Sequence, residues 1–97
     1  MEVQIKRSKR KDKKFDAIIA GKMTVSFGAK GMSDYTKNKD AERKERYIAR
    51  HGKNENWSNP KTAGFYAKNV LWNKTSLQAS VADINKKCPK LNVKLKL

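Results

Sequence analysis

The sequence predicts a small α+β domain with an N-terminal β-hairpin, two to three short helices and a C-terminal strand or extended tail. Three observations support this fold class. Two strand-like runs flank a glycine turn early in the chain, helix-capping residues recur through its middle, and apolar and polar residues alternate at its end. The 97 residues suit one domain, whose small core leaves only a marginal stability.

Residues 1–14 are interpreted as a mobile basic arm. Val3 and Ile5 alternate with polar neighbours, so a short strand is possible at the start of the chain. No apolar residue lies between Lys6 and Lys14, and a segment of that kind has nothing to bury on its own. The cations of this arm are Lys6, Arg7, Lys9, Arg10, Lys11, Lys13 and Lys14.

The compact domain is expected over residues 15–88, and it opens with a β-hairpin. Residues 15–20 are mostly apolar, Gly21 and Lys22 form the turn, and apolar residues alternate with polar ones over 23–27. The glycines at 28 and 31 end the second strand and predict a basic turn around Lys30.

The next segment predicts a helix between residues 40 and 51. Asp40 is a suitable N-cap and Gly52 stands where a helix stop is expected. Residues 33–38 before it are polar and form at most a single helical turn. On the helix, Asp40–Lys44 and Glu42–Arg46 have the spacing of stabilising acid-to-base pairs.

Two further helices are predicted after the first. Asn59 followed by Pro60 is a strong helix start, and that helix should run to about residue 72. Ser76 caps a third helix, which Pro89 stops. Trp57 and Trp72 are expected to anchor the core, although either indole would also suit stacking on a nucleic-acid base.

Residues 89–97 form an extended, strand-like tail. Apolar residues occupy every odd position from 91 to 97, which is the clearest strand pattern in the chain. The strand either completes the sheet of this domain, beside residues 15–27, or augments the sheet of a neighbouring molecule. The residues predicted to dock the tail are Leu91, Val93, Leu95 and Leu97.

A formal net charge of +15 dominates the composition, with 24 Lys and Arg against nine Asp and Glu. Solubility alone needs far less charge, so the excess indicates an anionic partner: nucleic acid, an anionic membrane surface or an acidic protein. Lysines outnumber arginines, which favours nonspecific electrostatics over base reading. The predicted binding residues are the seven cations of the arm, Lys30, the first-helix group Arg43, Arg46 and Arg50 with Lys44 and Lys53, and the group Lys86 and Lys87 with Lys90.

Catalytic and metal-binding patterns are not found. The single histidine, His51, lies at a helix end without a nucleophile or carboxylate set, and Cys88 is the only cysteine. We therefore expect no enzyme, no catalytic residue, no metal, no cofactor and no small-molecule substrate. No run has the length of a signal peptide or of a membrane span, and the lack of disulfide partners suits a reducing compartment.

The middle of the chain resembles a small protein family of nucleocytoplasmic large DNA viruses, the chlorella-virus, marseillevirus and mimivirus-like group. The resemblance covers about residues 14–85. It rests on an ordered series of short motifs, namely 27–36 (FGAKGMSDYT), 39–40 (KD), Arg43, 46–48 (RYI), 50–51 (RH), 54–57 (NENW), 61–65 (KTAGF), 71–74 (LWNK) and 76–77 (SL). No catalytic residues come with this family.

The resemblance implies a virion-associated protein. The first hypothesis is a structural minor capsid (cement) protein that links capsid subunits through its basic surface and extended ends. Its partners would be the major capsid jelly-roll capsomers and other minor capsid proteins. It would lie in the capsid shell, and in host cytoplasm or nucleus during assembly. The alternative is a nonspecific DNA-binding protein that coats or condenses the viral genome, and a third possibility is an early factor acting in the host cell.

Overall fold

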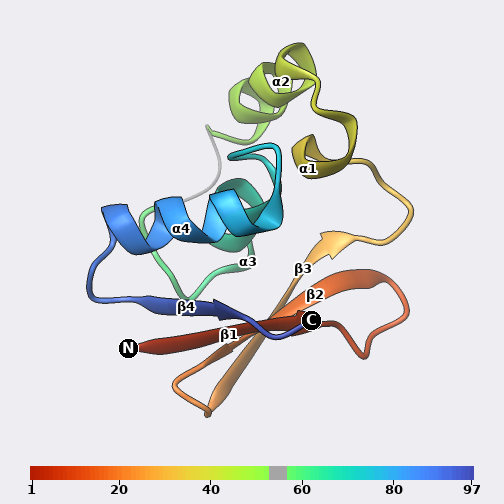
Figure 1. Ribbon diagram of the computed structural model, residues 1–97. Helices are drawn as coiled ribbons and strands as arrows, with labels where there is room; N and C mark the ends of the chain where they lie inside the picture. Colours follow the sequence, from red (N-terminus) through yellow and green to blue (C-terminus); the bar gives the residue numbers. More distant parts are fainter. Residues whose placement is uncertain (53–56) are drawn as a thin grey trace.

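The computed structural model describes residues 1–52 and 57–97, and it forms one four-stranded sheet with its helices on one side (Figure 1). The α+β fold class is therefore confirmed. The elements, in chain order, are β1 (Glu2–Arg7), β2 (Lys13–Ile19), β3 (Met23–Ala29), α1 (Tyr35–Asn38), α2 (Ala41–His51), α3 (Ala63–Tyr66), the π-helix η1 (Ala67–Leu71), α4 (Leu77–Lys87) and β4 (Asn92–Leu95).

The sheet has the strand order β3-β2-β1-β4. β2 and β3 form the predicted antiparallel hairpin, with Phe15 opposite Phe27 and Ile19 opposite Met23. In the turn between them, Ala20 and Gly21 have φ values of 53° and 68°. Positive φ at such positions gives the backbone twist that a tight hairpin needs.

β1 confirms the short strand around Val3 and Ile5, and it contradicts a mobile arm over residues 1–14. It is an inner strand, antiparallel to β2 and parallel to β4, and its Val3 and Ile5 are fully buried. Lys6 and Arg7 pair through their backbones with residues of β2, so their side chains need no apolar character to be held in place. The cations thus lie at the ends of two strands and on the turn that joins them.

The C-terminal strand belongs to this same sheet. β4 pairs with β1, with Val93 opposite Val3, and not with the β2–β3 hairpin. Leu91 and Val93 are buried in the core, Leu95 is partly buried and Leu97 is 55% exposed. Of the two alternatives for the tail, the strand therefore completes this domain's own sheet, and Leu91 and Val93 fill its core instead of docking on a neighbouring molecule.

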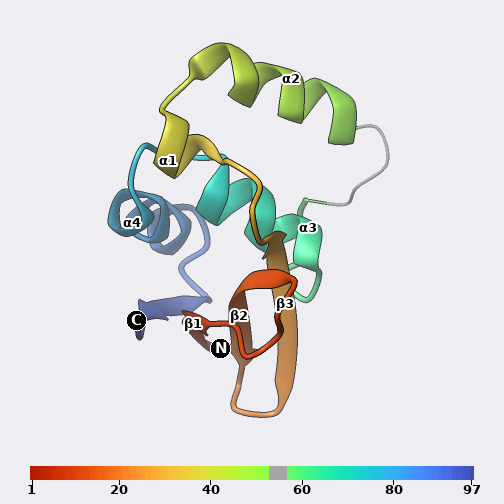
Figure 2. The same cartoon turned by 90° about the vertical axis from the view of Figure 1, so that its right-hand side faces the viewer.

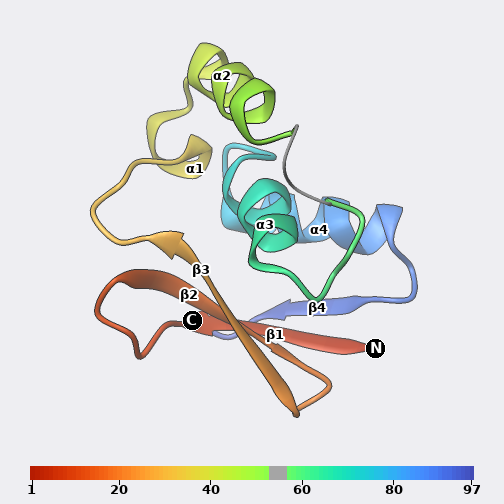
Figure 3. The same cartoon turned by 180° about the vertical axis from the view of Figure 1, so that it is seen from behind.

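The helices form two further layers above the sheet (Figures 2 and 3). α3, η1 and α4 pack on the sheet, and α2 lies beyond them, farthest from it. Ser76 caps α4 as predicted, because its hydroxyl accepts from the backbone N–H of Ala79. The buried side chains between sheet and helices include Phe27, Tyr66 and Val70.

The helix expected from Asn59 to residue 72 is shorter and less regular. Its N-cap is Thr62, whose hydroxyl accepts from the N–H of Phe65. The Asn59 side chain instead accepts from the N–H of Lys61 and holds a turn before the helix. From Ala67 the helix continues as η1, a π-helix, a form that usually occurs as a single turn within a longer helix.

Candidate anion-binding surface

α2 positions three arginines along one side of the molecule. Asp40 begins the helix, as predicted, by accepting hydrogen bonds from the N–H groups of Glu42 and Arg43. From there the spacing of Arg43, Arg46 and Arg50 is i, i+3, i+7, which places all three on one helix face. The three side chains border a pocket of about 260 Å³ together with Met32, Ser33 and Trp72. We call this site the arginine pocket.

No carboxylate neutralises the arginine pocket within the described ranges. The predicted Glu42–Arg46 pair does not form an ion pair there, and neither Arg43 nor Arg50 has one. The reason for the missing Asp40–Lys44 pair is that the Asp40 carboxylate is occupied with capping the helix. All three arginines are exposed, so their guanidinium groups are available to an anion from outside.

Aromatic and polar contacts hold α2 against the rest of the fold. Tyr47 stacks on Trp72 with ring centroids 4.7 Å apart and an interplanar angle of 8°. The Nζ of Lys44 donates to the carbonyl oxygen of Asn73 at 2.7 Å and lies 4.9 Å from the ring centroid of Tyr35. Trp72 is partly buried against the core, so the anchoring expected of it is observed, and its remaining surface faces the arginine pocket.

Other lysines surround Lys44 on the inner side of α2. Burial lowers the pKa of the Lys44 ammonium below its ordinary value, and the positive charges of Lys74, Lys68 and Lys87 lower it further. Lys44 is therefore held in place mainly by its contacts with Asn73 and Tyr35, next to other positive charges.

A second group of cations gathers at one end of the sheet. Arg7 at the end of β1, Lys14 at the start of β2 and Lys30 after β3 line a pocket of about 620 Å³ with Lys37 of α1. We call this site the lysine pocket. The turn between β1 and β2 lies next to it, because the N–H of Lys30 donates to the carbonyl of Asp12 in that turn. The exposed cations of this turn are Lys9, Arg10 and Lys11, whereas Lys6 lies on β1 and Lys13 on β2.

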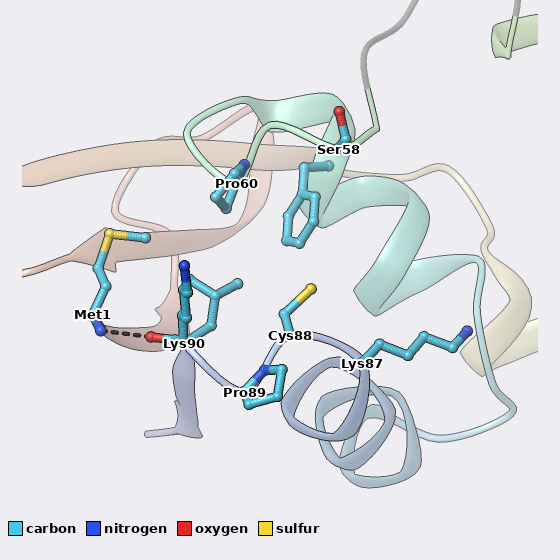
Figure 4. A pocket seen from close by; sticks show the side chains of 9 residues that line it. Met1, Ser58, Pro60, Lys87, Cys88, Pro89 and Lys90 are labelled. Atoms are coloured by element: carbon cyan, nitrogen blue, oxygen red, sulfur yellow. Dashed lines mark hydrogen bonds between the residues drawn. The ribbon is translucent and has the colours of Figure 1, made fainter.

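Lys86 and Lys87 lie at the opposite end of α4 from the lysine pocket. The Nζ of Lys87 is 3.0 Å from the carboxylate of Asp83, so part of this charge is neutralised. Lys87 lines a mostly apolar pocket of about 820 Å³ together with Cys88 and Pro89. Figure 4 shows the side chains around this pocket. This third predicted group therefore does not join the other two.

The sequence analysis named most of the cations in the two pockets, but it missed two of the residues that line them. Lys37 and Ser33 were not predicted as site residues, although both line the pockets. Asp34 could have indicated them, because it is a good N-cap residue before a possible helical turn. Its cap fixes where α1 begins, and therefore where the neighbouring residues of the 33–38 segment lie. Lys53 lies outside the described residues.

Comparison with known proteins assigns the chain to a family. A model described as a family of unknown function (DUF5754) matches residues 3–51. The chain belongs to the DUF5754 family. No curated protein and no solved structure matches it.

The DUF5754 match runs from β1 to the last residue of α2. It therefore contains the hairpin and the three arginines of α2, but not Trp72 or β4. The family description names neither a role nor a source, so the resemblance to a virus family stays a prediction. In the described part of this DUF5754 protein, none of the helices has the length and apolar character needed to cross a membrane.

Proposed function

We propose that this protein is a non-enzymatic binding protein that holds the phosphate backbone of nucleic acid, without sequence preference, against the arginine pocket. The observation that carries this proposal is the alignment of Arg43, Arg46 and Arg50 on one exposed helix face with no carboxylate partner among the described residues. Guanidinium groups bind phosphate oxygens in bidentate fashion, and successive phosphates present such oxygens in a row.

The rest of the molecule favours the same partner. The net charge of +15 attracts a polyanion over a long range, and the lysines near the lysine pocket and the β1–β2 turn extend the positive surface. The Ser33 hydroxyl is a further hydrogen-bond donor at the arginine pocket. Cations and a neutral hydrogen-bond donor suit contacts to the phosphate backbone, which carry no sequence information.

The test is binding of the full chain to a short DNA duplex over a range of salt concentrations. The triple variant R43Q/R46Q/R50Q removes the three guanidinium groups while keeping good helix formers on α2. We expect the slope of log affinity against log salt to fall by about one for each arginine that contacts a phosphate. Fluorescence anisotropy at several salt concentrations measures this slope.

The matched control is K22Q/K61Q/K94Q, which removes the same charge from exposed lysines outside the arginine pocket. Circular dichroism establishes that both triple variants are folded. Equal loss of slope in the two variants would show that only overall charge matters, and negligible binding of the wild-type chain at low salt would rule out the nucleic-acid proposal.

The second candidate function is the structural virion role, as a minor capsid (cement) protein. It rests on the resemblance to the virus family, and the exposed Leu97 at the end of the chain offers an apolar contact to a neighbour. The ends of the chain would not link capsid subunits as expected, because β1 and β4 are strands of the sheet. Contact with acidic capsid proteins would then come from the compact domain. Recovery with the shell after gentle opening of virus particles supports this role, whereas recovery with the genome supports the first.

A further inference from the structure

The lysine pocket has features that backbone binding at α2 does not use. It lies where the end of the sheet meets α1 and the first turn of α4, and it has no lining residue in common with the arginine pocket. Its volume of about 620 Å³ is within the range of pockets that enclose small ligands, roughly 300–1,000 Å³. The arginine pocket, at about 260 Å³, is less than half that size.

The charges in the lysine pocket leave a clear excess of cations. Arg7, Lys14, Lys30 and Lys37 line the pocket, and Asp34 is the only acidic side chain among the described residues that line it. This carboxylate is already engaged, because one oxygen accepts from Lys14 at 2.6 Å and the other from the N–H and hydroxyl of Thr36. The other three cations have no ion-pair partner among the residues that the structure describes.

The lysine pocket is built on buried parts of the fold. The side chains of Lys14 and Asp34 are only 9% and 3% exposed, so this pair forms a buried base beneath the exposed cations Arg7, Lys30 and Lys37. Beside it lies the ring of Phe15, which packs against Phe27 with centroids 5.8 Å apart, and Leu95 adds a second apolar side chain. The pocket therefore combines a cationic rim with an apolar wall.

We propose that the lysine pocket binds a phosphomonoester carried on a nucleoside. The phosphate would lie among Arg7, Lys30 and Lys37, and the base against the apolar wall that includes Phe15. A phosphomonoester carries up to two negative charges near neutral pH, so it gains more from three unpaired cations than a backbone diester with one. Two sources share this chemistry, a free nucleotide and the terminal phosphate of a nucleic-acid strand.

The experiment is isothermal titration of the full chain with adenosine monophosphate, adenosine and inorganic phosphate. Adenosine monophosphate should bind at least about tenfold more tightly than either part alone, because both the rim and the wall contribute. Equal affinity for inorganic phosphate and the nucleotide would overturn the proposal, and so would the absence of nucleotide binding at millimolar concentration.

Paired variants locate the binding. R7Q/K30Q should weaken nucleotide binding by at least about tenfold, since charge-assisted hydrogen bonds are lost. K22Q/K61Q, with the same charge removed from exposed positions outside the pocket, should change it less than about twofold. Both variants keep the buried Lys14–Asp34 pair, and thermal melts establish that they fold. Equal weakening in the two variants would overturn the proposal.

Oligonucleotides distinguish the two sources. Tighter binding of a 5′-phosphorylated single strand than of its 5′-hydroxyl counterpart, lost in R7Q/K30Q, identifies a strand end. Nucleotide binding without that difference identifies a free nucleotide. R43Q/R46Q/R50Q leaves the lysine pocket unchanged and should keep nucleotide binding. Duplex binding therefore tests the proposal at α2, and nucleotide binding separately tests the proposal at the lysine pocket.

Discussion

At the residue scale, the Lys14–Asp34 pair connects the sheet to the helical layer. The two side chains are almost fully buried, and their charged atoms are 2.6 Å apart. Asp34 also caps α1 by accepting from the N–H of Thr36, so one carboxylate both forms the ion pair and caps the helix. Removing one partner of a buried pair leaves the other charge without compensation, which is far more costly than losing an exposed pair.

We predict that Asp34→Ala lowers the free energy of unfolding by about 3–5 kcal/mol, because Lys14 is left buried and unpaired. Urea denaturation followed by circular dichroism measures the change. Asp12→Ala is the control, since the Arg10–Asp12 pair spans 3.6 Å with side chains 62% and 68% exposed, and its loss should matter much less. Similar losses in the two variants would contradict this account of Asp34.

At the scale of elements, β4 is an edge strand that is protected by a side chain from α4. The amide of Asn85 donates to the carbonyl of Val93 at 3.0 Å, and its oxygen accepts from the N–H of Val93 at 2.8 Å. These are the backbone groups that a further strand would use. Asn85 thereby blocks the middle of this edge and works against sheet augmentation by a neighbour.

We predict that Asn85→Ala lowers the free energy of unfolding by about 1–3 kcal/mol, because two partly buried backbone groups of Val93 lose their partners. The exposed edge should also increase self-association at high concentration, which size-exclusion chromatography with light scattering detects. Asn92→Ala, an exposed asparagine on the same strand, is the control. If both variants behave alike, Asn85 does not protect the edge.

At the scale of the whole molecule, charge acts on folding and on binding in opposite directions. The 24 basic residues outnumber the nine acidic ones, so like charges repel one another in the compact state. The same charge attracts a polyanion, and salt weakens both the repulsion and the attraction.

We predict that raising NaCl from about 50 mM to about 300 mM increases Tm and weakens duplex binding in the same range of salt. Each kcal/mol of repulsion that is screened should raise Tm by about 4–8 °C in a domain of this size. Differential scanning calorimetry and anisotropy titrations provide the two curves. A Tm that falls with salt would show that attractive ion pairs outweigh repulsion in this fold.

The sequence by itself determined the local elements and the overall charge. The hairpin around Gly21, the α2 helix capped by Asp40 and the α4 helix capped by Ser76 follow from turn and capping residues a few positions apart. Such signals act between neighbours in the chain, so no tertiary information is needed to read them.

Only the tertiary structure decided where the ends of the chain and the cations lie. The basic residues of β1, Lys6 and Arg7, are placed by backbone pairing with β2, and this pairing does not depend on the polarity of their side chains. Likewise, Arg7, Lys14, Lys30 and Lys37 meet in one pocket only because strand ends and α1 converge there. Contacts between residues far apart in sequence depend on strand order, which local residue patterns do not specify.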